Sequence, residues 1–121
     1  MEWRFSDDLP IYQQIMSQIK ACIAAGIWKP GDKLPSVREL ALEAEVNPNT
    51  MQKALSELER EGLLYSQRTA GRFVSDNDIK AKELQEEMMK EYIKTFLEQM
   101  EKLGYTPEET VKKLQSFIEN E

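Results

Sequence analysis

Four polar side chains whose chemistry suits the base edges of DNA lie in one short segment. They are Asn49, Thr50, Gln52 and Lys53. Helical spacing places them opposite an apolar stripe made of Met51, Ala54, Leu55 and Leu58. Amide side chains can pair with adenine through two hydrogen bonds, and a threonine hydroxyl can serve several bases. A solvated helix face has the same composition, so the pattern alone leaves both interpretations open.

The rest of the composition argues against catalysis. The chain has no histidine and a single cysteine, Cys22. The commonest general base is therefore absent, as are Ser-His and Cys-His catalytic pairs and thiolate–imidazole zinc sites. Aspartate and glutamate are plentiful, but none has a recognisable catalytic spacing. We expect no enzyme activity, no metal and no cofactor.

The formal net charge of −6 looks unsuited to DNA, but the acid is unevenly distributed. Residues 1–75 carry nine Lys/Arg and ten Asp/Glu, whereas residues 76–121 carry seven Lys and twelve Asp/Glu. Binding depends on the local potential and not on the total charge. We therefore expect a DNA-binding domain over 1–75 and a separate tail over 76–121.

The chain shows no sign of a membrane or secretory segment. No apolar run approaches the roughly 18 residues that a membrane span needs. The first residues lack the basic and apolar stretches of a secretory signal. We expect a cytoplasmic protein with no membrane partner.

A first helix is predicted over residues 9–25. Asp8 suits its N-cap, Pro10 falls in its first turn, and Gly26 suits its end. Its apolar stripe repeats every four residues, at Ile11, Ile15, Ile19 and Ile23.

Two further helices are separated by a tight connection. Ser36 and Glu39 form a capping-box pattern before a short helix over 37–44. Asn47 and Pro48 suit the cap and first position of a third helix, which Gly62 ends. This spacing is typical of a helix-turn-helix.

Strand-like segments at 63–67 and 72–75 flank a turn, which predicts a β-hairpin wing. A long helix from about 78 to 103 and a last helix capped by Thr106 follow. The predicted fold is mainly α with a small β-hairpin wing: a winged helix-turn-helix followed by a helical hairpin that forms a dimerisation tail.

The tail carries an apolar stripe that two helices cannot bury alone. We expect it to form a homodimer interface through Leu84, Met88, Tyr92, Ile93, Phe96, Leu97, Met100, Leu114, Phe117 and Ile118. The alternative is a ligand pocket for a small-molecule effector. Trp3 and Phe5 in the N-terminal arm would pack either on the first helix or on a partner.

Several blocks of sequence resemble the GntR family of winged-helix regulators in order and spacing. They are residues 30–41, 46–55, 58–63 and 71–74, within a match over about 9–75. The short helical tail and the run 47–50, Asn-Pro-Asn-Thr, resemble the YtrA subfamily. The chain departs from many family members at Pro48 and Gln52, where basic residues are common, so the base preference does not carry over.

The resemblance implies a homodimeric transcription regulator, most often a repressor, on a palindromic double-stranded DNA operator. Arg38 stands where the family places a DNA-contacting arginine. With the cations of the same module, the expected DNA-binding residues are Lys33, Ser36, Arg38, Asn47, Asn49, Thr50, Gln52, Lys53, Arg68, Thr69, Gly71 and Arg72. The rival functions are a small-molecule-sensing regulator and a protein-interaction adaptor that kept the winged scaffold.

Overall fold

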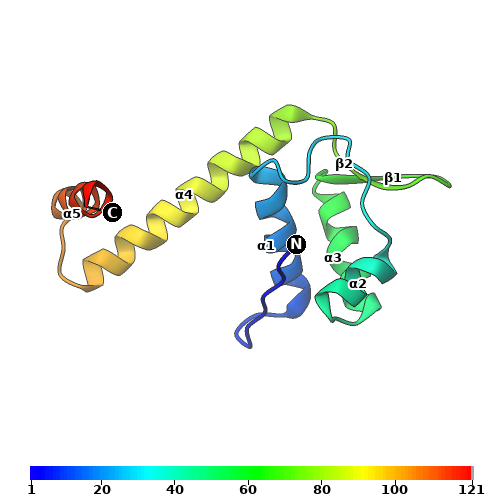
Figure 1. Ribbon diagram of the computed structural model, residues 1–121, viewed down its shortest axis with the longest axis horizontal. Helices are drawn as coiled ribbons and strands as arrows, with labels where there is room; N and C mark the ends of the chain where they lie inside the picture. The colour runs from blue at the N-terminus through cyan, green and yellow to red at the C-terminus, as the bar shows by residue number, and fades with distance from the viewer. Residues whose placement is uncertain (121) are drawn as a thin grey trace. The chain divides into compact units, whose positions relative to one another are not determined.

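A computed structural model describes residues 1–120, which form helices and one two-stranded antiparallel sheet (Figure 1). The chain divides into two compact units, Met1–Gln85 and a second unit that begins at Glu86. Helix α4 (Asp78–Lys102) starts in the first unit and continues into the second. The first unit therefore extends beyond Ser75, where the charge distribution placed the boundary.

The first unit is built around one helix. Helix α3 (Pro48–Arg60) packs against α1 (Ile11–Ala24), α2 (Val37–Ala44) and the first strand of the sheet. Apolar residues three and four apart form one face on each helix, and burying these faces drives the packing. The largest fully buried side chains are Ile15, Ile19, Leu40, Met51, Leu55, Leu58 and Val74.

The caps of α2 and α3 are those that the sequence predicts. The Ser36 hydroxyl accepts a hydrogen bond from the Glu39 backbone N–H, and the Glu39 carboxylate accepts one from the Ser36 backbone N–H. Asn47 caps α3 through its side-chain oxygen, which accepts the Asn49 N–H at 2.7 Å. Between the helices, Glu45 adopts a left-handed conformation with φ 57°.

The predicted start of α1 is wrong. Pro10 occupies the N-cap, with no side-chain cap, and Asp8 lies outside the helix. The Ser6 hydroxyl donates to the Asp8 carboxylate and lowers the pKa of Asp8. The side chain of Gln14 instead holds the entry to α1, since its amide donates to the Leu9 and Ser6 carbonyls.

The N-terminal arm lies along α1 and reaches α2. The Trp3 and Phe5 rings stack with their centroids 6.2 Å apart. Trp3 Nε1 donates to the Glu43 carboxylate on α2 at 3.3 Å. Arg4 and Gln18 exchange two hydrogen bonds that join the arm to α1.

The predicted wing is confirmed as strands β1 (Leu64–Gln67) and β2 (Gly71–Val74). A third segment of the chain, at Lys33 and Leu34, lies beside β2. Lys33 forms a bridge with Phe73, and the Leu34 N–H donates to the Arg72 carbonyl at 2.9 Å. This segment connects the wing to the start of α2.

The second unit contains the rest of α4 and helix α5 (Pro107–Glu119). A capping box between Thr106 and Glu109 starts α5, and the backbone N–H of Thr106 lowers the pKa of the Glu109 carboxylate. The apolar side chains of α5 remain exposed at Val111, Leu114, Phe117 and Ile118. None of the helices in the described residues combines the length and apolar content of a membrane span.

Leu84 differs from the rest of the expected dimer interface. Its side chain is 8% exposed and belongs to the first unit, so it contributes to the core of that unit. A place for Leu84 in an interface with a second copy stays a prediction, and its burial within the first unit leaves little of its surface for a partner.

The core position of α3 predicts unequal effects for two leucine substitutions. Leu58→Ala removes a side chain that is 0% exposed and should lower the free energy of unfolding by about 2–5 kcal/mol. Leu42→Ala, at a position on α2 that is 80% exposed, should change it by less than about 0.5 kcal/mol. Urea unfolding at one protein concentration measures both variants. Equal losses would contradict the central place of α3 in the core.

Candidate nucleic-acid interface

The N-terminal end of α3 presents the polar face that the sequence predicts. Asn49, Gln52 and Lys53 are exposed, and Thr50 is half-buried. Gln52 Nε2 donates to the Ser56 hydroxyl at 3.0 Å, so the amide lies along the helix surface. The cap uses the side-chain oxygen of Asn47, and its amide nitrogen is not part of that bond. Donors and acceptors therefore line the outer side of the first two turns.

Lys53 is held toward α1 by an aromatic ring. Its ammonium nitrogen lies 4.0 Å from the centroid of the Tyr12 ring, a cation–π distance. The contact restricts the rotamers of a flexible side chain and keeps its charge beside the start of α1.

Arg38 lies in the first turn of α2 with its side chain exposed. Within residues 1–120, the ion pairs do not include Arg38. Its charge is therefore not compensated by a direct carboxylate contact, and an exposed guanidinium suits contact with phosphate or with a base edge.

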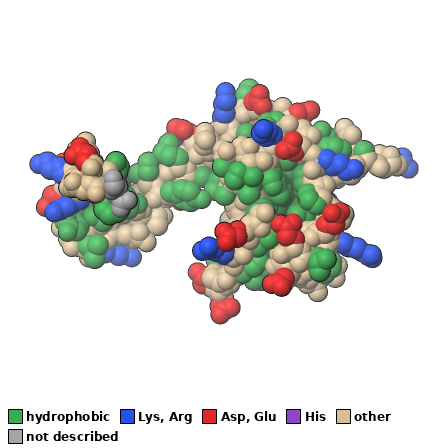
Figure 2. Space-filling model, in the orientation of Figure 1, with side chains coloured by type: hydrophobic (Ala, Val, Ile, Leu, Met, Phe, Trp, Pro, Cys, Tyr) green, Lys and Arg blue, Asp and Glu red, His purple; other side chains and the backbone are tan. Residues whose placement is uncertain are grey.

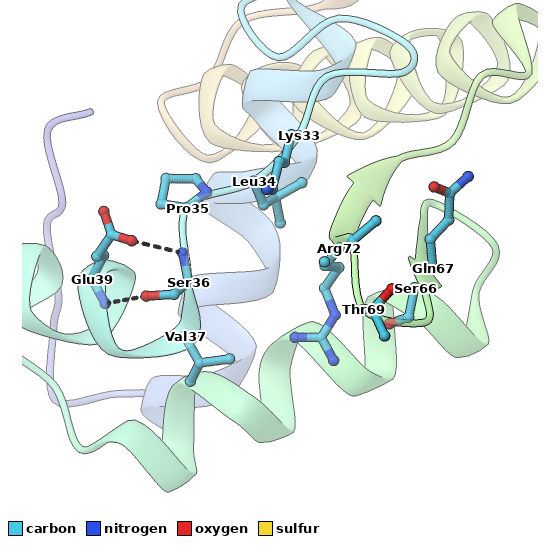
Figure 3. A pocket seen from close by; sticks show the side chains of 12 residues that line it. Lys33, Leu34, Pro35, Ser36, Val37, Glu39, Ser66, Gln67, Thr69 and Arg72 are labelled. Atoms are coloured by element: carbon cyan, nitrogen blue, oxygen red, sulfur yellow. Dashed lines mark hydrogen bonds between the residues drawn. The ribbon is translucent and has the colours of Figure 1, made fainter.

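An open groove of about 560 Å³ lies between the start of α2 and the wing (Figure 3). The predicted residues that it brings together are Lys33, Ser36, Thr69, Gly71 and Arg72. Gly71 has φ 112°, a conformation that L side chains rarely adopt. A Cβ at Gly71 would also lie 3.2 Å from Cε of Lys33, so glycine keeps the groove open beside this lysine.

Two arginines of the wing have different surroundings. Arg68 is exposed in the turn between the strands. Arg72 points from β2 toward α3 (Figure 3), with Nη2 3.5 Å from the Glu59 carboxylate. Its side chain is 15% exposed. The structure thus sets Arg72 apart from the other eleven expected DNA-binding residues, because its guanidinium faces another part of the domain.

Sequence reasoning missed three residues that shape this surface: Tyr12, Glu59 and Ser66. Each acts through a partner that is distant in the sequence. Ser66 donates to the Glu59 carboxylate from β1, seven residues away. Ser66 and Arg72 are cross-strand partners, and no sequence pattern showed that both reach α3.

Comparison with known proteins identifies the family. The family model for bacterial regulatory proteins of the gntR family matches residues 11–74. The chain is 40% identical over 119 residues to the HTH-type transcriptional regulator YhcF of Bacillus subtilis, across 98% of each protein. It is 56% identical over 68 residues to the transcriptional repressor YtrA of Bacillus subtilis, a match that covers 56% of this chain and 52% of that repressor.

Solved structures agree with the winged fold. A GntR family transcriptional regulator from Listeria monocytogenes superposes with a TM-score of 0.85 at 37% identity, covering 93% of this chain and 98% of that one. The DNA-binding domain of AraR in complex with operator ORR3 superposes with a TM-score of 0.54 at 33% identity, covering 62% of this chain and 90% of that one.

These similarities confirm the predicted fold, the family resemblance and its YtrA-like character. The relatives are named as transcriptional regulators, and regulators of this family are not enzymes, in agreement with the lack of a catalytic pattern. The chain is therefore a DNA-binding transcriptional regulator that belongs to the YtrA-like branch of the gntR family of bacterial regulatory proteins.

Proposed function

We propose that the protein represses transcription by binding a palindromic operator as a homodimer. The observation that carries the proposal is the exposed polar end of α3, with the exposed Arg38 and the wing groove within the same unit. This arrangement offers base-reading groups and phosphate-binding groups on one domain. The similarity to YtrA, which is named a repressor, supports the direction of regulation.

In this proposal the start of α3 enters the major groove. Recognition helices contact base edges with their N-terminal residues, and Asn49, Thr50 and Gln52 are the residues there that can hydrogen-bond to bases. Arg38, Lys53 and Asn47 flank them and suit phosphate oxygens. The similarity to the AraR domain bound to its operator supports this use of the fold.

The wing groove suits the DNA backbone beside the recognition helix. Lys33 and Arg68 supply charge, and Ser36 and Thr69 supply hydroxyl groups. At Gly71 the absence of a side chain permits close approach of the strand to the minor groove. Backbone contacts of this kind fix orientation and depend on salt, whereas the α3 contacts set the sequence preference.

The tail supports pairing with a second copy. Apolar side chains follow one another along α4 at steps of four and three residues, a spacing typical of a coiled-coil seam. They are Met89, Ile93, Phe96 and Met100, and Leu103 continues the spacing just after the helix ends. Ile93 is 49% exposed and Leu103 is 73% exposed, so this single chain leaves the seam uncovered. Apolar side chains are visible at the surface along α4 in Figure 2.

Pairing through this seam would bring two DNA-binding units to one operator. A two-fold dimer places its recognition helices in successive major grooves about 34 Å apart, which requires an operator with two-fold symmetry. Met88, Tyr92 and Leu97 flank the seam on α4, and Leu114, Phe117 and Ile118 extend the exposed apolar surface onto α5.

Loss of the Arg38 charge should weaken binding to a similar extent for all DNA sequences. Arg38→Gln removes one exposed cation from each subunit, so the slope of log affinity against log salt should fall in magnitude by about two for the homodimer. Titration of a labelled operator at several salt concentrations measures this slope. Arg60→Gln, which removes a charge near the other end of α3, is the matched control and should keep the slope. An unchanged slope for Arg38→Gln would remove this residue from the interface.

Loss of the Gln52 amide should change base preference. Gln52→Ala removes a side chain that can pair with adenine, a contact worth about 1–3 kcal/mol of discrimination. Selection of bound DNA from a random pool should recover a motif that is relaxed at one position in each half-site. Recovery of the wild-type motif with wild-type affinity would show that Gln52 does not read bases.

A charge in the seam should separate the homodimer. Phe96→Lys places an ammonium where a partner helix would bury it, and burying an unpaired charge is costly. Sedimentation of this variant should then give the mass of one chain. Its affinity for the operator should also be lower than that of the wild-type protein. Glu91→Lys introduces the same side chain on the opposite face of α4 and should leave the dimer intact. A wild-type protein that sediments as a single chain would contradict the proposal.

A further inference from the structure

We propose that Arg72 and Ser66 are positioning residues that fix the wing to the recognition helix through Glu59, and that Arg72 does not contact DNA. We call the three residues the Glu59 clamp. The inference rests on the proposed function, because the angle between wing and recognition helix affects activity only if the domain binds DNA.

The clamp joins both strands of the wing to one carboxylate. Ser66 on β1 donates its hydroxyl to Oε1 of Glu59, and Nη2 of Arg72 on β2 lies 3.5 Å from Oε2. Each carboxylate oxygen therefore has its own partner. Glu59 lies in the last turn of α3, so the two contacts tie the hairpin to the end of the helix that lies away from Asn47.

The register of the hairpin explains why these two side chains meet. Ser66 and Arg72 are direct cross-strand partners, as are Leu64 and Val74. Side chains two residues apart on a strand share a face, so all four belong to the same side of the hairpin. Leu64 and Val74 are buried. The clamp therefore continues the core-facing side of the wing with polar groups, at the point where apolar burial ends.

The opposite side of the hairpin has its own contact. Tyr65 and Phe73, which alternate with the clamp residues, stack with ring centroids 5.5 Å apart. The wing is thus internally braced on one side and attached to α3 on the other. The part of the hairpin that extends past the apolar pair Leu64 and Val74 is attached to α3 by the clamp.

Burial favours a role inside the domain for Arg72. Its side chain is 15% exposed and that of Glu59 is 27% exposed, so solvent screens this pair less than the surface pairs of the chain. Among the described residues, Nε of Arg72 is buried without a hydrogen-bond partner. Orientation toward Glu59 therefore leaves one guanidinium donor unsatisfied, and Arg68 is the wing arginine that remains exposed.

The clamp also neutralises an acid on the DNA-binding helix. Without Arg72, the Glu59 carboxylate would be an uncompensated negative charge in a partly buried site, and it would repel DNA phosphate. With Arg72 beside it, the pair carries no net charge. A clamp and a DNA contact therefore predict opposite effects for the removal of Glu59. Loss of Glu59 would free an arginine that binds DNA and strengthen binding, whereas it would loosen a wing that depends on the clamp and weaken binding.

The test uses Glu59→Gln, Arg72→Gln and the double variant in the full chain, with Arg68→Gln as a control for loss of one wing charge. We expect each clamp variant to bind operator roughly fivefold more weakly, a factor equal to about 1 kcal/mol. The double variant should be no weaker than Arg72→Gln, because both changes remove the same contact. The salt slope should stay unchanged in the clamp variants and fall in magnitude by about two in Arg68→Gln, one for each subunit of the homodimer.

Two further measurements separate positioning from loss of folding. Hydrogen exchange should speed up at the amides of β1 and β2 in both clamp variants and not in Arg68→Gln. Arg72→Lys retains the charge and should recover most of the affinity and wing protection. A clamp variant that lowers the thermal midpoint by more than about 10 °C would indicate general loss of stability. In that case the affinity and wing protection of Arg72→Lys decide whether the clamp positions the wing.

Tighter operator binding by Glu59→Gln would overturn the inference, as would a lower salt slope for Arg72→Gln. Unchanged exchange at the wing would also overturn it. Absence of salt-sensitive binding by the unmodified chain would instead reject the proposed function. Faster wing exchange in both clamp variants would in that case still support the clamp as a contact of the fold.

Discussion

The structure depends on the two-sided character of α3. One face of this helix carries Met51, Leu55 and Leu58 into the core between α1, α2 and β1. The other face must then remain in solvent, and it carries the amides and the lysine that suit DNA. Because the helix repeats every 3.6 residues, burying one set of side chains fixes the direction of the other. The orientation of these polar side chains follows from the packing of the core.

Local signals in the sequence predicted most of the fold. The capping pairs Ser36–Glu39 and Thr106–Glu109 each involve residues three apart, and both form as expected. Helix periodicity located the core faces, and the glycine-containing turn located the wing. Such features depend on neighbours in the chain, so a single sequence contains the information that they need.

Features made by distant residues were not predictable in this way. The bridge between Lys33 and Phe73 spans forty residues of chain, and a segment with Pro30 and Gly31 gave only a turn signal. The sequence predicted that Arg72 is a DNA-binding cation of the wing, whereas the structure shows that it pairs with Glu59. The predicted start of α1 was wrong because the Asp8 side chain accepts a hydrogen bond from Ser6. The Gln14 side chain donates to the chain before the helix instead. The candidate site was therefore predictable as a set of residues on α2, α3 and the wing, but not in its internal contacts.

The first turns of α4 belong to the first unit. Lys80 donates from its ammonium to the Glu61 carbonyl at the end of α3, and Gln85 Nε2 donates to the Ala24 carbonyl at the end of α1. The last carbonyls of a helix have no partner within it, so these side chains satisfy groups that would otherwise need water. Leu84 is buried between these two contacts in the sequence. The first turns of α4 are consequently part of the core that orients α3, and the same uninterrupted helix continues to Lys102 with the exposed seam.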